Sequence, residues 1–214
     1  LAIRSATKVT AKLLDGAKNL KVIGRAGIGV DNVDIPAATA KGVIVMNTPF
    51  GNSITTAEHA ITLMLALARQ IPQADTSTQA GKWEKNRFMG VEITAKTLGV
   101  IGCGNIGSIV ADRGHGLRMK VIAYDPYLSA DEIAARGAEK VELHDLMRRS
   151  DFVSISCPLS KDNRRMIGAR EFALMRPHAF FITTARGFIH DEEALYEALR
   201  DKRIAGAGLD VWDK

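Results

Sequence analysis

A glycine-rich turn gives the most specific chemical signal in this sequence. An apolar run that ends at Ile101 leads directly into Gly102-Cys103-Gly104-Asn105-Ile106-Gly107, a G-x-G-x-x-G pattern. In that pattern the first glycine allows a tight turn, the second lets a pyrophosphate approach the backbone, and the third lets a helix pack on a strand. The helix expected after the turn would offer free N–H groups and a partial positive charge to phosphates. We therefore expect the three glycines of this turn to contact a dinucleotide.

Asp125 supplies the second half of this signal. It ends the next apolar run and lies 23 positions after Gly102, close to the spacing of about 20 expected for a carboxylate that binds ribose hydroxyls. The following residue is Pro126 rather than an arginine that could hold a 2′-phosphate, so the pair favours NAD over NADP. Two alternatives stay open: a structural turn with a surface aspartate, and another nucleotide-like cofactor such as S-adenosylmethionine.

A second glycine-rich turn, Gly24-Arg25-Ala26-Gly27-Ile28-Gly29, has no matching acid at the end of the next expected strand. Val30-Asp31-Asn32 follows it instead of a helical pattern. This segment is either a tight turn or a cradle of successive backbone N–H groups for an anion.

Two polar residues follow other buried strands. Arg186 comes after the apolar run 180–184, and Asp210 ends the run 205–210. In open α/β sheets, ligands bind outside the carboxyl ends of the strands, and an arginine there can hold a carboxylate with two parallel hydrogen bonds. We expect both residues at a ligand site, with an ordinary surface position as the alternative.

Histidines and cysteines give little support for other chemistry. None of the five histidines lies near a carboxylate pattern typical of a proton relay or a zinc site, and each is expected to be structural or on the surface: His59, His115, His144, His178 and His190. Cys103 and Cys157 lack metal-ligand spacing and cannot form a disulfide framework, so we expect no metal and a reducing cytoplasm.

The composition excludes several classes of protein. The 214 residues are 46% hydrophobic and 25% charged, which is ordinary for a globular protein and argues against disorder. No apolar run is long enough for a membrane span. The net charge of +5 comes without a basic stripe interleaved with aromatic residues, so a small anionic ligand or a solvated basic surface fits better than nucleic acid.

Short apolar runs alternate with helical patterns along the chain. Most runs are continuously apolar, which indicates strands buried on both faces of a parallel sheet. The expected strands are residues 20–26, 43–47, 97–102, 120–125, 152–157, 180–184 and 205–210. Ser129 with Glu132 predicts a helix that starts in a capping box, and the acidic residues 191–193 predict the first turn of another helix.

The longest helical pattern has a broad apolar stripe. Thr55 with Glu58 predicts its capping box, the stripe runs to Ile71, and Pro72 is expected to end the helix. A stripe this wide is either core or a subunit interface. Residues 74–94 contain no expected strand and are predicted to form helix plus an arm.

These motifs, in this order, resemble the D-isomer-specific 2-hydroxyacid dehydrogenases over essentially the whole chain. Besides the two glycine turns, the resemblance rests on Arg4-Ser5-Ala6-Thr7-Lys8-Val9-Thr10, Ala185-Arg186-Gly187, Asp191-Glu192 and Leu209-Asp210-Val211. It implies an α/β fold in which residues 49–214 form a Rossmann-like doubly wound parallel sheet with a dimerisation helix. Residues 1–48 would form part of a second, flavodoxin-like substrate domain.

The resemblance also implies roles for individual residues. Arg186 is similar to the family's catalytic arginine, which holds the substrate carboxylate and carbonyl. The family's substrate contacts correspond to Arg4, Arg25, Gly27 and Asn52. Its NAD contacts correspond to Ile28, Gly102, Gly104, Asn105, Ile106, Gly107, Asp125, Cys157, Pro158, Thr184, Ala185 and Asp210.

The activity implied by the resemblance is hydride transfer from the 2-hydroxyl of D-3-phosphoglycerate, or of a close 2-hydroxy acid, to NAD. For D-3-phosphoglycerate this is the first step of serine biosynthesis, and the family implies at least a homodimer. An NAD-sensing, corepressor-like binding protein on the same fold is the alternative from another class.

The sequence departs from the family pattern at three points. The family's general acid/base histidine and its glutamate would follow residue 214, so we expect a fragment truncated at both ends and inactive by itself. His190 replaces a small aliphatic residue and is expected on the surface. Thr183-Thr184 replaces a more common Asn-Cys or Asn-Ser pair, so the side-chain contacts of that pair are not carried over.

Overall fold

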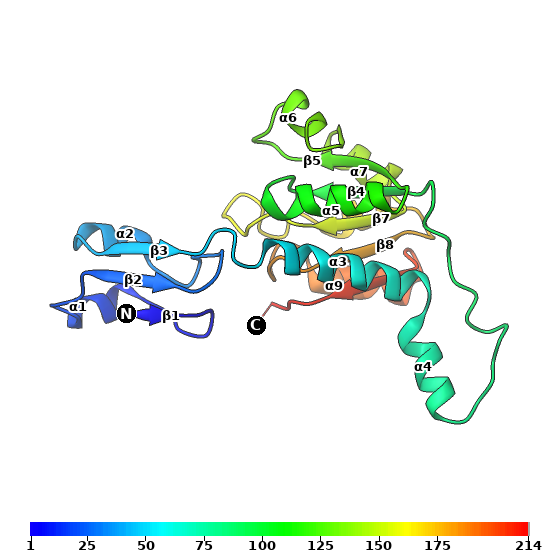
Figure 1. The fold of residues 1–214 in the computed structure, drawn as a ribbon, viewed down its shortest axis with the longest axis horizontal. Coiled ribbons are helices and arrows are strands. Elements are labelled where there is room, and N and C mark those ends of the chain that lie inside the picture. Colours follow the sequence, from blue (N-terminus) through cyan, green and yellow to red (C-terminus); the bar gives the residue numbers. More distant parts are fainter. Residues whose placement is uncertain (214) are drawn as a thin grey trace. The chain divides into compact units, whose positions relative to one another are not determined.

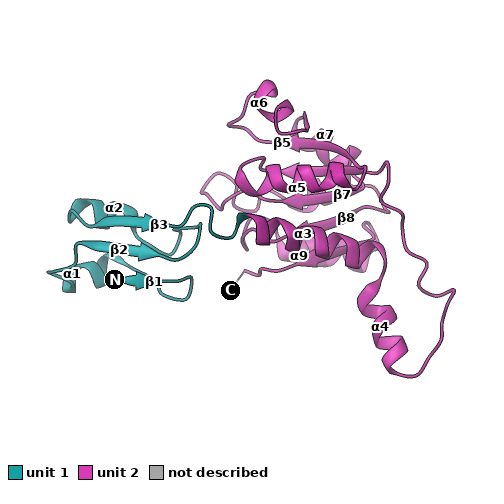
Figure 2. Ribbon diagram, in the orientation of Figure 1, with its two compact units in different colours: residues 1–53 teal, residues 54–214 magenta. Residues whose placement is uncertain are grey.

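Two parallel sheets, each with its own hydrophobic core, organise the chain (Figure 1). The computed structural model describes residues 1–213, and the chain divides into a unit of residues 1–53 and a unit of residues 54–214 (Figure 2). This division lies a few residues after the boundary at residue 48 expected from the sequence. The substrate-domain and dinucleotide-domain roles expected for the two parts stay predictions.

The first unit contains a three-stranded parallel sheet in the order β1-β2-β3. Its elements are β1 (Ala2–Ile3), α1 (Ala11–Gly16), β2 (Val22–Arg25), α2 (Ile35–Ala40) and β3 (Ile44–Asn47). The side chains of Thr10 and Asp34 cap the two helices by accepting hydrogen bonds from backbone N–H groups. Buried Val9, Leu14 and Ile23 belong to the core of this unit.

The second unit contains a six-stranded parallel sheet in the order β6-β5-β4-β7-β8-β9. Its strands are β4 (Thr97–Ile101), β5 (Lys120–Tyr124), β6 (Glu139–Lys140), β7 (Phe152–Ile155), β8 (Phe180–Thr183) and β9 (Gly206–Leu209). The order runs outward in both directions from β4 and β7, so the predicted doubly wound, Rossmann-like sheet is confirmed. In such sheets the ligand crevice lies outside the carboxyl ends of the strands, where the strand order reverses.

Helices cover both faces of the six-stranded sheet (Figure 1). The core of one face includes residues of α3 (Ser53–Ala68), α5 (Asn105–Gly116) and α6 (Ala130–Ala134). The core of the other face includes residues of α7 (Leu143–Arg149), α8 (Ala169–Leu174) and α9 (Glu192–Arg200). Of the helices in residues 1–213, none has the length and apolar character needed to cross a membrane.

The predicted long helix is two helices. α3 begins at Ser53, so Thr55 lies inside it and the expected Thr55–Glu58 capping box was wrong. Gln70 has a left-handed φ of 52° and separates α3 from α4 (Ile71–Gln79). Pro72 therefore lies in the first turn of a new helix, where its missing N–H costs nothing, rather than at the end of the old one.

Two other helix starts are confirmed. Ser129 and Glu132 form the predicted reciprocal capping box of α6. Asp191 is the N-cap residue of α9, with its side chain accepting two backbone hydrogen bonds and two glutamates in the first turn.

His190 is fully buried, contrary to the surface position expected from the sequence. It forms an isolated parallel bridge with Ile167, and its ring lies 5.5 Å from that of Phe181. Neither ring nitrogen has a hydrogen-bond partner. Burial lowers the pKa of His190, and the nearby carboxylates, Asp213 first, offset this only in part. The bridge turns the side chain into the core, a consequence of tertiary pairing that the local sequence does not reveal.

Replacing His190 by leucine should stabilise the fold by about 1 kcal/mol, because the desolvation of two unpaired nitrogens is removed. In the unmodified chain, the free energy of unfolding should fall as the pH drops below the ordinary histidine pKa of 6.5. In that range the unfolded ring takes up a proton that the folded ring, with its lowered pKa, does not yet bind. Chemical denaturation from about pH 8 down to about pH 5 measures both effects. Equal pH dependence in the two proteins would contradict the assignment.

Candidate functional site

The turn after β4 requires glycine at two positions and leaves a third open. Gly102 has a positive φ of 87°, and a Cβ there would lie 2.7 Å from the backbone nitrogen of Cys157. A Cβ at Gly107 would lie 1.9 Å from the carbonyl oxygen of Gly102, so the first turn of α5 packs closely on the preceding turn. Gly104, the N-cap residue of α5, has no non-neighbouring heavy atom within 4 Å of its Cβ position. The N-terminus of α5 can therefore receive an anionic group at Gly104.

Asp125 lies directly beside this turn, just after β5. One carboxylate oxygen accepts a hydrogen bond from the backbone N–H of Cys103 at 2.9 Å, and the other accepts one from Tyr127 at 3.0 Å. The residue is only 9% exposed. β4 and β5 pair in parallel with Ile101 opposite Tyr124, so the residues that follow the two strands meet at one edge. The acid and the turn thus form one site, as their spacing predicted.

Side chains after β7 and β8 extend this edge. Cys157 lies against Gly102, and burial raises the pKa of its thiol to about 11. The side-chain amide of Asn163 donates a hydrogen bond to the carbonyl oxygen of Pro158 at 2.7 Å and holds this segment. The hydroxyl of Thr184 is buried without a hydrogen-bond partner. The open end of α5, the neighbouring carboxylate and this unpaired hydroxyl together fit a dinucleotide, whose polar groups would supply the missing partner.

Arg186 follows β8 in a closely packed turn. Its guanidinium donates a hydrogen bond to the carbonyl oxygen of Ala185 at 2.7 Å. A Cβ at Gly187 would lie 2.2 Å from the carbonyl oxygen of Trp212, so the chain after β9 lies directly on this turn. An arginine held in this way at the carboxyl edge can bind a carboxylate with two parallel hydrogen bonds.

Phe188, two residues after Arg186, has a positive φ of 63°, which is uncommon for a residue other than glycine. Its backbone N–H donates to the carboxylate of Asp213, and its carbonyl oxygen accepts from the N–H of Arg165 at 2.6 Å. The guanidinium of Arg164 lies 4.1 Å from the centroid of the Phe188 ring. Strain that the surroundings hold in this way is typical of ligand sites.

Asp210 follows β9 and pairs with His59 of α3, with 3.4 Å between Nε2 and Oδ1. The pairing arises because α3 packs across β9: a Cβ at Gly208 would lie 3.2 Å from the side chain of Leu63. Sequence reasoning missed His59 because the two residues lie far apart in the chain. The small residues of β9 were the available signal, since they admit a helix at close range.

Two further histidine–carboxylate pairs were also missed, and both join separate elements. His178 lies 2.9 Å from the carboxylate of Asp151, and His144 lies 3.1 Å from that of Glu171. Asp151 precedes β7 and accepts a hydrogen bond from the N–H of Thr97 at 2.8 Å, so it lies at the opposite edge of the sheet. Within residues 1–213, no group of three His, Cys, Asp or Glu side chains could hold a metal ion.

In the first unit, three of the four expected substrate residues lie at one edge of the small sheet. Arg25 ends β2 and pairs with Ile3 of β1, so Arg4 lies at the same edge. Gly27 has a positive φ of 148°, and a Cβ there would lie 1.7 Å from the guanidinium of Arg25. Asn52 is exposed near the end of the unit. The substrate roles of these residues stay predictions.

The remaining residues expected at the cofactor lie on turns that are described above, in both units. Asn105 and Ile106 begin α5, and Ala185 directly precedes the catalytic candidate. Ile28 lies in the glycine-rich turn of the first unit, where its carbonyl oxygen accepts a hydrogen bond from the side chain of Asn47 at 2.8 Å. Their contacts with a cofactor also stay predictions.

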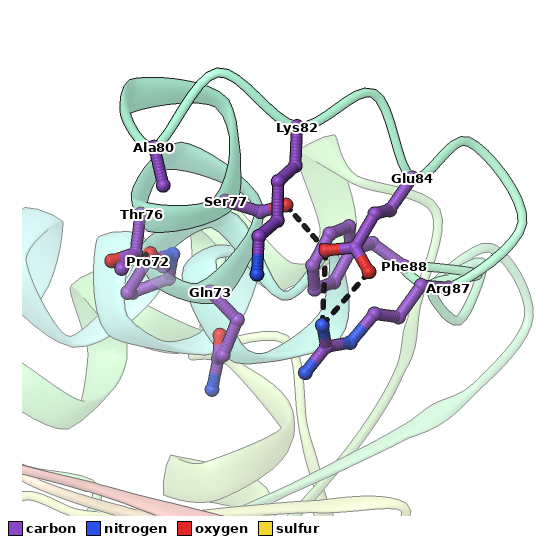
Figure 3. Close-up of a pocket in the computed structure, with 9 residues that line it drawn as sticks. All are labelled: Pro72, Gln73, Thr76, Ser77, Ala80, Lys82, Glu84, Arg87 and Phe88. Carbon is purple, nitrogen blue, oxygen red and sulfur yellow. Dashed lines mark hydrogen bonds and ion pairs between the residues drawn. The ribbon is translucent and has the colours of Figure 1, made fainter.

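A groove of about 460 Å³ lies away from the carboxyl edge of the six-stranded sheet, along α4 and the segment after it (Figure 3). Glu84 accepts hydrogen bonds there from the hydroxyl of Ser77 at 2.6 Å and from the guanidinium of Arg87 at 3.0 and 2.9 Å. These bonds lower the pKa of the Glu84 carboxyl. Sequence reasoning expected a helix and an arm here but no groove.

Comparison with known sequences identifies the larger unit. Residues 61–214 match the family described as D-isomer specific 2-hydroxyacid dehydrogenase, NAD binding domain. The D-3-phosphoglycerate dehydrogenase of Archaeoglobus fulgidus is 49% identical over 214 residues, which is all of this chain and 41% of that protein. The human enzyme of the same name is 46% identical over 212 residues, covering 99% of this chain and 40% of its own. The chain thus spans about two fifths of these relatives.

Solved structures agree in fold. The D-lactate dehydrogenase of Aquifex aeolicus, complexed with NAD and lactic acid, has a TM-score of 0.92 at 31% identity and covers 100% of this chain and 64% of its own. An acyclic imino acid reductase in complex with NADPH and D-Arg also has a TM-score of 0.92 at 31% identity, covering 100% of this chain and 68% of its own. The structural comparison therefore agrees with the sequence comparison.

Replacing Gly107 by alanine should destabilise the second unit by about 2 kcal/mol, because the new Cβ would collide with the carbonyl oxygen of Gly102. Gly116→Ala, at the other end of the same helix, has nothing within 4 Å of the new atom and serves as the control. It should leave stability unchanged or raise it slightly. Denaturant unfolding measures both, and similar effects of the two substitutions would contradict the close packing of the turn.

Proposed function

The chain belongs to the D-isomer specific 2-hydroxyacid dehydrogenases, and from this membership we propose that its protein oxidises the 2-hydroxyl of D-3-phosphoglycerate with NAD. The observation that carries the proposal is the similarity of the whole chain, at 49% identity, to an enzyme of that activity. The proposal applies to a protein as long as these relatives, of which this chain spans about two fifths. D-3-phosphoglycerate oxidation would place it at the first step of serine biosynthesis. Another small 2-hydroxy acid could use the same residues.

The cofactor would lie along the carboxyl edge of the six-stranded sheet. The pyrophosphate would bind at Gly104, where the N-terminus of α5 offers backbone N–H groups. Asp125 would accept hydrogen bonds from the adenosine ribose hydroxyls. Thr184 and Asp210, on neighbouring strand ends, would hold the nicotinamide end. NAD supplies the hydride acceptor, and the protein supplies orientation and charge.

Arg186 would hold the substrate carboxylate so that C2 faces the nicotinamide. The closely packed turn around Gly187 keeps the backbone of the arginine in place. An arginine fixed in this way would orient the substrate, and orientation lowers the activation barrier of the reaction. The oxidation also releases a proton from the hydroxyl. The family resemblance assigns that proton to a histidine and a glutamate beyond residue 214.

We also propose a homodimer in the cytoplasm. Large apolar side chains are exposed along residues 71–89, namely Ile71 at 55%, Trp83 at 86% and Met89 at 76%. Exposed apolar side chains that lie close together are typical of protein contacts, and these three belong to one segment of the chain. Two free cysteines support a reducing compartment.

NAD(H) should bind more tightly than NADP(H), because the Asp125 carboxylate accepts from ribose hydroxyls and repels a 2′-phosphate. Asp125→Ala should reduce the difference between the two affinities, because it weakens NADH binding and removes the repulsion of the 2′-phosphate. Titration of NADH and NADPH by fluorescence measures both affinities. Equal affinities in the unmodified protein would contradict the role of Asp125.

In a protein as long as its relatives, Arg186→Ala should lower kcat/KM by roughly 100-fold or more, since the substrate carboxylate loses its charged partner. The affinity for NADH should change far less. Arg148→Ala, at an exposed position of α7, is the matched control. Near-normal turnover of the Arg186 variant would remove this residue from the mechanism.

Trp83→Asp should shift a homodimer toward monomers, because it replaces a large apolar side chain that is 86% exposed by a charged one. Light scattering at micromolar concentration measures the mass. A monomer in the unmodified protein would rule out the dimer proposal.

A further inference from the structure

Arg136 is a cation beside the glycine turn that the proposed cofactor site does not use. It follows α6, and its guanidinium donates a hydrogen bond through Nη1 to the carbonyl oxygen of Cys103. Within residues 1–213 this side chain makes no other hydrogen bond and no ion pair at contact distance. A guanidinium has five N–H donors in a planar fork, so most of its donors stay available.

Arg136 and Asp125 lie on the two sides of one residue of the turn. The backbone N–H of Cys103 donates to the Asp125 carboxylate at 2.9 Å, while the carbonyl oxygen of the same residue accepts from Arg136. Both charges also act on the Cys103 thiol: Arg136 lowers its pKa and Asp125 raises it, although burial, which raises it, is the larger cause. The two opposite charges therefore contact the backbone of the same residue, without forming an ion pair with each other.

This placement puts a positive charge next to the proposed ribose site. In that site Asp125 faces the ribose hydroxyls, and a 2′-phosphate in the same place would carry negative charge toward it. A guanidinium forms strong, charge-assisted and often bidentate hydrogen bonds to phosphate. The carboxylate therefore disfavours a 2′-phosphate, and the arginine favours it.

We propose that Arg136 is a second determinant of cofactor choice, which lets this site accept a 2′-phosphorylated dinucleotide more weakly than NAD(H) but measurably. The inference rests on the proposed NAD site and deepens it. The balance between Asp125 and Arg136, rather than the aspartate alone, then sets the discrimination between the two cofactors.

Arg136 lies outside the place where the sequence is usually searched for such a residue. The position after Asp125 holds Pro126, and Arg136 comes eleven positions after the aspartate. The fold brings it back because the capping box at Ser129 starts α6 there and Gly137, with a positive φ of 79°, ends the turn that follows the helix. A purely structural brace of the glycine turn is the competing explanation, and it would affect both cofactors alike.

The test compares the affinities of NADH and NADPH, measured by titration calorimetry on the purified protein. Arg136→Gln keeps an N–H donor for the Cys103 carbonyl but removes the charge, whereas Arg136→Lys keeps a charge. We expect Arg136→Gln to weaken NADPH binding about tenfold and NADH binding less than about twofold, with Arg136→Lys in between. Arg148→Ala, which removes an exposed arginine elsewhere, should change neither affinity.

A second pair of variants isolates the arginine from the repulsive carboxylate. Asp125→Ser should strengthen NADPH binding, and adding Arg136→Gln to it should abolish that gain. Equal loss of both cofactors in Arg136→Gln, or no loss of either, overturns the proposal, as does NADPH binding that is undetectable in both the unmodified protein and Asp125→Ser. In those cases NADH binding by the unmodified protein leaves the proposed function intact. Absence of NADH binding overturns both.

Discussion

The hydrogen bond from the backbone N–H of Cys103 to the carboxylate of Asp125 joins the two parts of the candidate cofactor site. It forms only because β4 and β5 run parallel in register, with the N–H of Gly102 donating to the carbonyl oxygen of Tyr124 at 2.8 Å just beyond the last strand pair. The same register places the N-terminus of α5 beside the acid. In the proposed site, phosphate binding and ribose binding would therefore depend on one pairing of two strands.

The strand order extends this edge into a row of candidate site positions. β7 pairs with β4 on its other side, which brings Cys157 against Gly102. β8 and β9 follow, and Arg186 and Asp210 come after them at the same edge. Because all six strands are parallel, every loop that follows a strand lies on one side of the sheet. A dinucleotide and a small acid could then be held by residues that follow five neighbouring strands, β5, β4, β7, β8 and β9.

Local signals account for what was predictable. The seven strands of four or five residues were predicted because each coincides with an apolar run in the sequence, although β3 is largely exposed rather than buried. The glycine turn was predicted because its backbone geometry demands glycine at Gly102 and Gly107. β6 was missed because its two residues, Glu139–Lys140, are polar and pair only at the edge of the sheet. The break between α3 and α4 depends on the left-handed conformation of Gln70, for which glutamine gives no signal. The burial of His190 and the contacts of His59 and Arg136 come from tertiary packing between distant segments.

Amide hydrogen exchange with and without NADH tests the location of the cofactor site most directly. Slower exchange is expected for the backbone N–H groups of residues 102–107 and 184–186, where the turn, the helix N-terminus and the unpaired hydroxyl lie. Residues 72–88, around the groove of Figure 3, should exchange at the same rate in both states. Protection confined to residues 72–88, or no protection at residues 102–107 under saturating NADH, would contradict the account.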